Sequence, residues 1–159
     1  MQSFISLAQI DEVTNNVRSR ISIQPVVGLI LGSGLNGLAD SVQNPIHIPY
    51  SDLPNFPTST VHGHVGQFVI GELEGKAVIV MQGRIHYYEG YTMGQVTLPV
   101  RVMHRLGVQS MFVTNAAGGV NADFAPGDVM LITDQLNLMG MSGLNPLMGP
   151  NLEEIGPRF

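Results

Sequence analysis

Two apolar runs, each ending in a glycine-containing turn, constrain the fold of this chain most strongly. Residues 25–31 (PVVGLIL) lead into the turn 32–34 (GSG), and residues 108–114 (VQSMFVT) lead into the turn 115–119 (NAAGG). A short apolar run bounded by turn residues is typical of a buried strand. We therefore predict two buried strands that end in tight loops, and a third strand at 128–133.

The remaining apolar patterns predict helices and a hairpin between these strands. Helical spacing covers residues 4–21 and 93–106, and Gly107 is a natural C-cap. A hairpin is expected over 67–81, and a short extended piece over 45–50. This order predicts an α/β fold with a mixed, twisted sheet flanked by helices, in a single domain over the whole chain.

Composition narrows the possible functions. The net charge is -5, and the 7 Lys and Arg residues are scattered, so we expect no nucleic-acid partner. There are no cysteines and the 5 histidines lack metal-ligand spacing, so we expect no metal. The N-terminus has no signal-peptide pattern, and the apolar runs are too short for a membrane span. We therefore expect a cytoplasmic enzyme that does not contact membranes.

Four loops carry residues suited to binding an anion. They are GSGLNG at 32–37, STVHGH at 59–64, QGRIH at 82–86 and TNAAGG at 114–119. Glycines let backbone N–H groups approach an anion, and Arg and His side chains add donors suited to phosphate. Taken alone, the loops at 32–37, 82–86 and 114–119 are also compatible with ordinary structural roles, and the loop at 59–64 is better explained as a solvated loop.

A dinucleotide-binding domain is one alternative, because Gly32, Gly34 and Gly37 have the GxGxxG spacing. That reading requires an acidic residue at the end of the second strand and a helix between the two strands. The nearest acid, Asp52, lies in a proline-rich loop, and the intervening helix would be too short. The pattern therefore disfavours this alternative.

Taken together, the order and spacing of these motifs resemble those of the trimeric class of purine nucleoside phosphorylases. The resemblance rests on GSGL at 32–35, FPTSTVHGHVG at 56–66, QGRIHYYEGY at 82–91, TNAAGG at 114–119 with PGD at 126–128, and GLNPLMGPN at 143–151. It implies cleavage of purine nucleosides by phosphate to give the free base and a pentose 1-phosphate. It also implies a homotrimer, small-molecule substrates and no cofactor.

The resemblance also implies roles for particular residues. Phosphate would be held by Ser33, His64, Arg84, His86 and the backbone N–H of Ala116, with His86 as the catalytic residue. The nucleoside would lie against Tyr88, Asn115, Ala116, Ala117 and Gly118, and Phe159 would close the sugar site of a neighbouring subunit.

Several alternatives stay open at this stage. Members of the resembled family extend well past residue 159, so the domain is expected to be incomplete at its C-terminus and to lack the residues that grip the purine. The chain is then either part of an active phosphorylase or a phosphate-binding fragment without turnover. A methylthioadenosine phosphorylase is a related alternative, and the preference between 6-oxo and 6-amino purines is undetermined.

Overall fold

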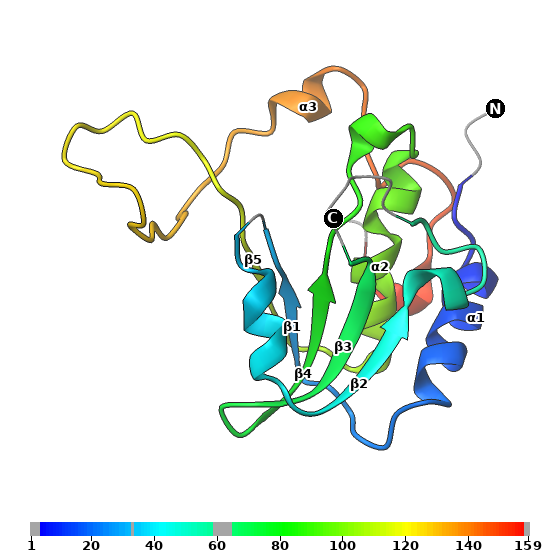
Figure 1. Ribbon diagram of the computed structural model, residues 1–159. Helices are drawn as coiled ribbons and strands as arrows, with labels where there is room; N and C mark the ends of the chain where they lie inside the picture. The colour runs from blue at the N-terminus through cyan, green and yellow to red at the C-terminus, as the bar shows by residue number, and fades with distance from the viewer. Residues whose placement is uncertain (1–3, 33, 59–64, 158–159) are drawn as a thin grey trace.

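The computed structural model describes residues 4–32, 34–58 and 65–157. A five-stranded sheet with the order β2-β3-β4-β1-β5 forms its centre (Figure 1). The strands are β1 (Val27–Ile30), β2 (Gln43–Pro49), β3 (Gln67–Leu73), β4 (Lys76–Gln82) and β5 (Ser110–Val113). β1 pairs in parallel with β4 and β5, whereas β2, β3 and β4 are antiparallel. The expected mixed sheet is confirmed.

The predicted hairpin is formed by β3 and β4 through a two-residue turn. Leu73 pairs with Lys76, and Glu74 and Gly75 between them have φ values of 49° and 69°. Positive φ at both central residues matches the twist of the strands that a tight hairpin connects. The predicted extended piece is the edge strand β2, where an irregular register lies beside Pro45, as expected for a residue that cannot donate to the ladder.

Two helices pack on one face of the sheet. Helix α1 (Leu7–Arg18) starts with a capping box from Ser6, and helix α2 (Met93–Leu106) starts with one from Thr92 and ends at Gly107 with φ 108°. The predicted helix 93–106 is therefore confirmed at both ends, while the predicted helix 4–21 is shorter than expected.

Side chains that alternate along the strands form a separate hydrophobic core on each face of the sheet. Phe68, Ile70, Ile79 and Met81 belong to the cluster that also holds the apolar sides of α1 and α2. The intervening residues Val69, Val78 and Val80 pack on the other face with Leu31, Ala39 and Val42. Leu31 directly follows β1, whereas Ala39 and Val42 lie in or next to the 3-10 turn Asn36–Ser41. Because side chains alternate in a strand, neighbouring buried residues of β3 and β4 belong to different cores.

Two expectations about strands are wrong. β5 is an edge strand whose four residues are all exposed, with Phe112 and Val113 each 60% accessible. Residues 128–133 form no strand, and Val129 is 99% accessible. Apolar composition predicted burial, but a strand forms only beside a partner, and the described chain places none there.

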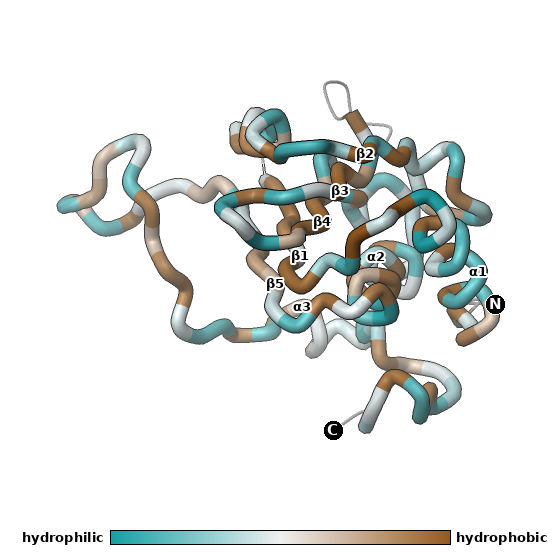
Figure 2. Tube along the Cα trace, turned by 90° about the horizontal axis from the view of Figure 1, so that it is seen from below, coloured by the Kyte–Doolittle hydropathy of each residue, from teal (hydrophilic) through white to brown (hydrophobic). Residues whose placement is uncertain are grey.

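The segment after β5 extends away from the sheet. It projects as a long loop before returning through the short helix α3 (Leu138–Met141) and the 3-10 turn Glu153–Ile155 (Figure 1). Figure 2 shows apolar and polar residues interleaved along this loop. Within the described residues, no helix is long and apolar enough to cross a membrane.

Candidate active site

Three loops meet where the parallel strands end. β4, β1 and β5 are neighbours in this order and run in the same direction, so their carboxyl ends share one edge of the sheet (Figure 1). The loops that follow start at Leu31, Gly83 and Thr114. α/β proteins bind ligands at such an edge.

Thr114 ties the first loop to the third. Its Oγ1 accepts a hydrogen bond from the Gly32 backbone N–H at 2.7 Å and donates to the Ile30 carbonyl at 3.1 Å. A Cβ atom on Gly32 would lie 2.7 Å from the Thr114 carbonyl oxygen and 2.9 Å from the Asn115 Cα. Glycine is therefore required at position 32 for the two loops to approach this closely.

Arg84 connects the second loop to Thr114. One guanidinium N–H donates to the Thr114 carbonyl oxygen at 2.7 Å, and the Nε–H donates to His86 Nε2 at 3.2 Å. Arg84 and His86 thus project to the same side, as their spacing predicted. Both are partly buried, so a positive group and an imidazole stand together at the strand ends.

His86 is oriented by Glu89. The Glu89 carboxylate accepts from the His86 backbone N–H at 2.8 Å and lies 3.2 Å from His86 Nδ1. Since Nε2 accepts from Arg84, the tautomer that satisfies both contacts carries its proton on Nδ1 and donates it to Glu89. The side chain of Glu89 is only 2% accessible. Sequence reasoning missed Glu89, although the 3-10 turn Tyr87–Glu89 brings a residue three positions away back to the histidine.

Tyr50 supports the turn that carries Arg84. Its hydroxyl donates to the Gly83 carbonyl oxygen at 2.8 Å, and Gly83 has φ 95°. Its ring lies against Phe56 and Phe68, with centroids 5.0 Å and 5.2 Å away. Burial raises the pKa of the Tyr50 hydroxyl, so it stays a proton donor. No local pattern predicts this contact, because the partners are 33 residues apart.

The residues expected to contact a nucleoside lie around this cluster. Tyr88 stacks on His86 with centroids 4.7 Å apart and is 73% accessible. Asn115, Ala116, Ala117 and Gly118 form the exposed loop that follows Thr114. Ser33, His64 and Phe159 lie outside the described residues.

The arrangement can present donors to an anion. Arg84, His86 and the backbone of two small-residue loops stand at one edge, with one buried carboxylate behind the imidazole. Among the described residues, no group of three or more His, Cys, Asp or Glu side chains could hold a metal ion. The geometry therefore suits positioning and charge stabilisation of an anionic reactant.

Comparison with known proteins identifies the family. The sequence model described as the phosphorylase superfamily matches residues 26–159. The chain belongs to the phosphorylase superfamily. Purine nucleoside phosphorylase 1 of Geobacillus stearothermophilus is 57% identical over 150 residues, which make up 94% of this chain and 54% of that protein. The purine nucleoside phosphorylase of Rattus norvegicus is 52% identical over 143 residues, or 90% of this chain and 50% of that protein.

Solved structures agree with this assignment to the superfamily. Schistosoma mansoni purine nucleoside phosphorylase in complex with inosine has a TM-score of 0.89 and 43% identity, and the match covers 100% of this chain and 56% of that one. A purine nucleoside phosphorylase in complex with ribose-1-phosphate has a TM-score of 0.90 and 45% identity, with 99% and 58% covered. The chain thus spans about half the length of the curated relatives it matches.

Proposed function

We propose that the protein containing this chain is a purine nucleoside phosphorylase, which converts purine ribo- or deoxyribonucleosides and phosphate into the free base and a pentose 1-phosphate. The observation that carries the proposal is the Arg84–His86 pair, tied through Thr114 to the loop after β1. Similarity to purine nucleoside phosphorylases over nearly the whole chain supports the reaction class.

Phosphate is the nucleophile in this proposal. One of its oxygens forms a bond to the anomeric carbon as the bond from that carbon to the purine nitrogen breaks, and the proton that the hydrogen phosphate gives up ends on the departing base. The transition state resembles an oxocarbenium ion, as in other glycosyl transfers. Arg84 and His86 orient the phosphate dianion, whose charge stabilises the cation. Ser33, His64 and the Ala116 N–H complete the set of donors.

His86 is assigned the catalytic role because its two ring nitrogens face different partners. In the ligand-free arrangement, Nε2 accepts from Arg84 while Nδ1 lies beside Glu89. When phosphate takes the Arg84 donors, a proton on Nε2 lets His86 donate to a phosphate oxygen, and Glu89 compensates the resulting imidazolium.

The nucleoside would bind beside the phosphate, against Tyr88 and the loop of Asn115, Ala116, Ala117 and Gly118. Small residues in that loop allow a flat purine to lie against the backbone. We further propose a cytoplasmic homotrimer in purine salvage, with Phe159 closing the sugar site of a neighbouring subunit. Side chains that grip the purine ring would come from sequence after residue 159.

Removal of the Arg84 guanidinium tests the phosphate site. Hydrogen bonds to charged groups contribute roughly 1.5–3 kcal/mol each, so Arg84→Ala should weaken phosphate binding by about 10- to 100-fold. Arg20→Ala is a matched control, because Arg20 pairs with Asp52 on the surface at 3.4 Å. Phosphate affinity is measured by calorimetry on both variants. Unchanged affinity in Arg84→Ala would remove Arg84 from the site.

A further inference from the structure

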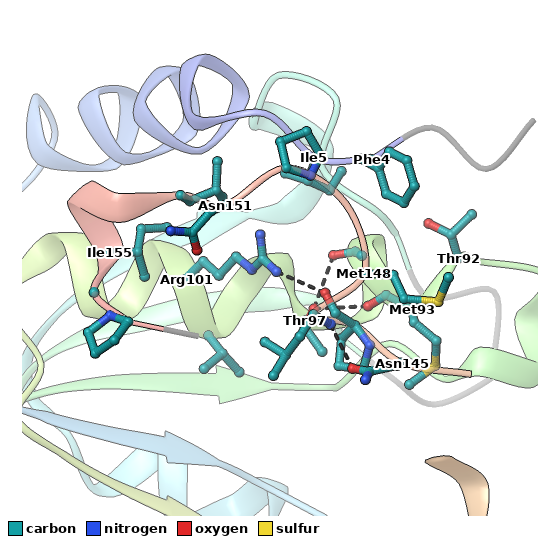
Figure 3. A pocket seen from close by; sticks show the side chains of 18 residues that line it. Phe4, Ile5, Thr92, Met93, Thr97, Arg101, Asn145, Met148, Asn151 and Ile155 are labelled. Carbon is teal, nitrogen blue, oxygen red and sulfur yellow. Dashed lines mark hydrogen bonds between the residues drawn. The ribbon is translucent and has the colours of Figure 1, made fainter. Parts of the chain in front are cut away.

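A cavity lies apart from the strand-end loops described above. It has a volume of about 350 Å³ and opens between the N-terminal segment, the first turns of α2 and residues 145–157 (Figure 3). Neither Arg84 nor His86 lines it, and neither does the loop 114–119. Its size lies at the lower end of the range for small-molecule sites, roughly 300–1,000 Å³.

The lining of this cavity is apolar around one cation. Apolar contacts come from Phe4, Ile5, Val100, Leu147, Met148 and Ile155. Among the described residues of the lining, Arg101 is the only charged one, and none is Asp or Glu. Figure 3 shows the Arg101 side chain reaching from α2 towards residues 145–148.

Arg101 is held in place but has no carboxylate partner among the described residues. One guanidinium N–H donates to the Pro146 carbonyl oxygen at 2.9 Å. The ion pairs in the described part of the chain instead join Arg20 to Asp52, His86 to Glu89 and Arg105 to Asp11. Partial burial lowers the pKa of Arg101, because desolvation disfavours the charged form. A negative charge close to this guanidinium would favour its charged form.

We propose that this cavity binds a small monocarboxylate with an apolar body. The planar guanidinium fork matches the two oxygens of a carboxylate. One cation neutralises one negative charge, and an apolar lining penalises a second charge, which disfavours a phosphate dianion. Asn145 and Asn151 also line the cavity, and their side-chain amides carry N–H donors that suit a carboxylate.

Octanoate is a suitable probe, because it joins one carboxylate to a flexible apolar chain. Its binding to residues 1–159 at neutral pH is followed by amide ¹H–¹⁵N chemical shifts. We expect shifts concentrated at residues 92–101 and 145–157. Arg101→Gln should weaken octanoate binding by about 10-fold or more, since it removes a charge-assisted interaction. Arg20→Gln is the matched control for loss of one surface charge, and should bind octanoate like the parent.

A neutral probe separates recognition of the carboxylate from support of the cavity wall. Octan-1-ol has the same apolar chain without the charge, so Arg101→Gln should leave its binding nearly unchanged. Equal loss of octanol and octanoate in this variant would show that Arg101 only holds Pro146, and would overturn the proposal. So would the absence of octanoate-induced shifts at the lining residues of the parent chain.

Discussion

Replacing Thr114 with valine tests how the loops of the candidate site are joined. The change keeps the shape of the side chain but removes the hydroxyl that accepts from Gly32 N–H at 2.7 Å and donates to the Ile30 carbonyl at 3.1 Å. The Ile30 carbonyl keeps the backbone N–H of residue 114, at 3.0 Å. The main loss is therefore the acceptor for the backbone N–H of Gly32, and Gly32 is buried.

The size of the effect follows from that single unsatisfied group. Leaving a buried donor without a partner costs about 1–3 kcal/mol, and each kcal/mol lowers Tm by about 2–4 °C in a domain of this size. The loss of stability is measured by urea unfolding followed by far-UV circular dichroism, because this chain has no tryptophan whose fluorescence could be followed. Thr114→Ser keeps the hydroxyl and should retain most of the stability. Equal stability of Thr114→Val and the parent chain would refute the proposed coupling of the two loops.

Three other substitutions test neighbouring contacts. Gly32→Ala should cost about 1–3 kcal/mol in urea unfolding, because the new Cβ meets backbone atoms of Thr114 and Asn115, whereas Gly37→Ala, with no atom within 4 Å, should not. Glu89→Gln should weaken phosphate binding by about 10-fold in calorimetry, because His86 loses the carboxylate that would compensate its imidazolium beside the phosphate. An effect no larger than that of Asp11→Asn would contradict this. Tyr50→Phe should cost about 1 kcal/mol at neutral pH through the lost bond to Gly83. Because folding raises the pKa of Tyr50 above its unfolded value near 10, the parent should lose stability as pH rises above about 10, and Tyr50→Phe should lose less.

Local signals in the sequence predicted most of the fold. Helix α2 was predicted from its first to its last residue, since Gly107 ends it in a left-handed conformation. The β3–β4 hairpin followed from two apolar runs around a short turn. The exposure of β5 could not be predicted in this way, because an apolar strand looks the same in the sequence whether or not another element covers it.

In the candidate site, too, a contact within one loop could be predicted and a contact between distant loops could not. The sequence placed Arg84 and His86 on one side of one loop, and the structure brings them to 3.2 Å. Thr114 as the junction between loops was not predicted, because Gly32 and Thr114 are 82 residues apart. The expected roles of Ser33, His64 and Phe159 stay predictions, since these residues lie outside the described ranges.

Phosphate-dependent release of hypoxanthine from inosine tests the central claim most directly. The assay compares residues 1–159 with a chain extended to the length of the relatives, each with and without phosphate. We expect rapid phosphorolysis by the extended chain and little by residues 1–159, because loss of even one preorganised group at the leaving base costs about 10²–10³ in rate. Equal rates would contradict the division of the site between the two parts. An extended chain that is inactive with phosphate, or that cleaves inosine equally well in water alone, would contradict the phosphorylase assignment itself.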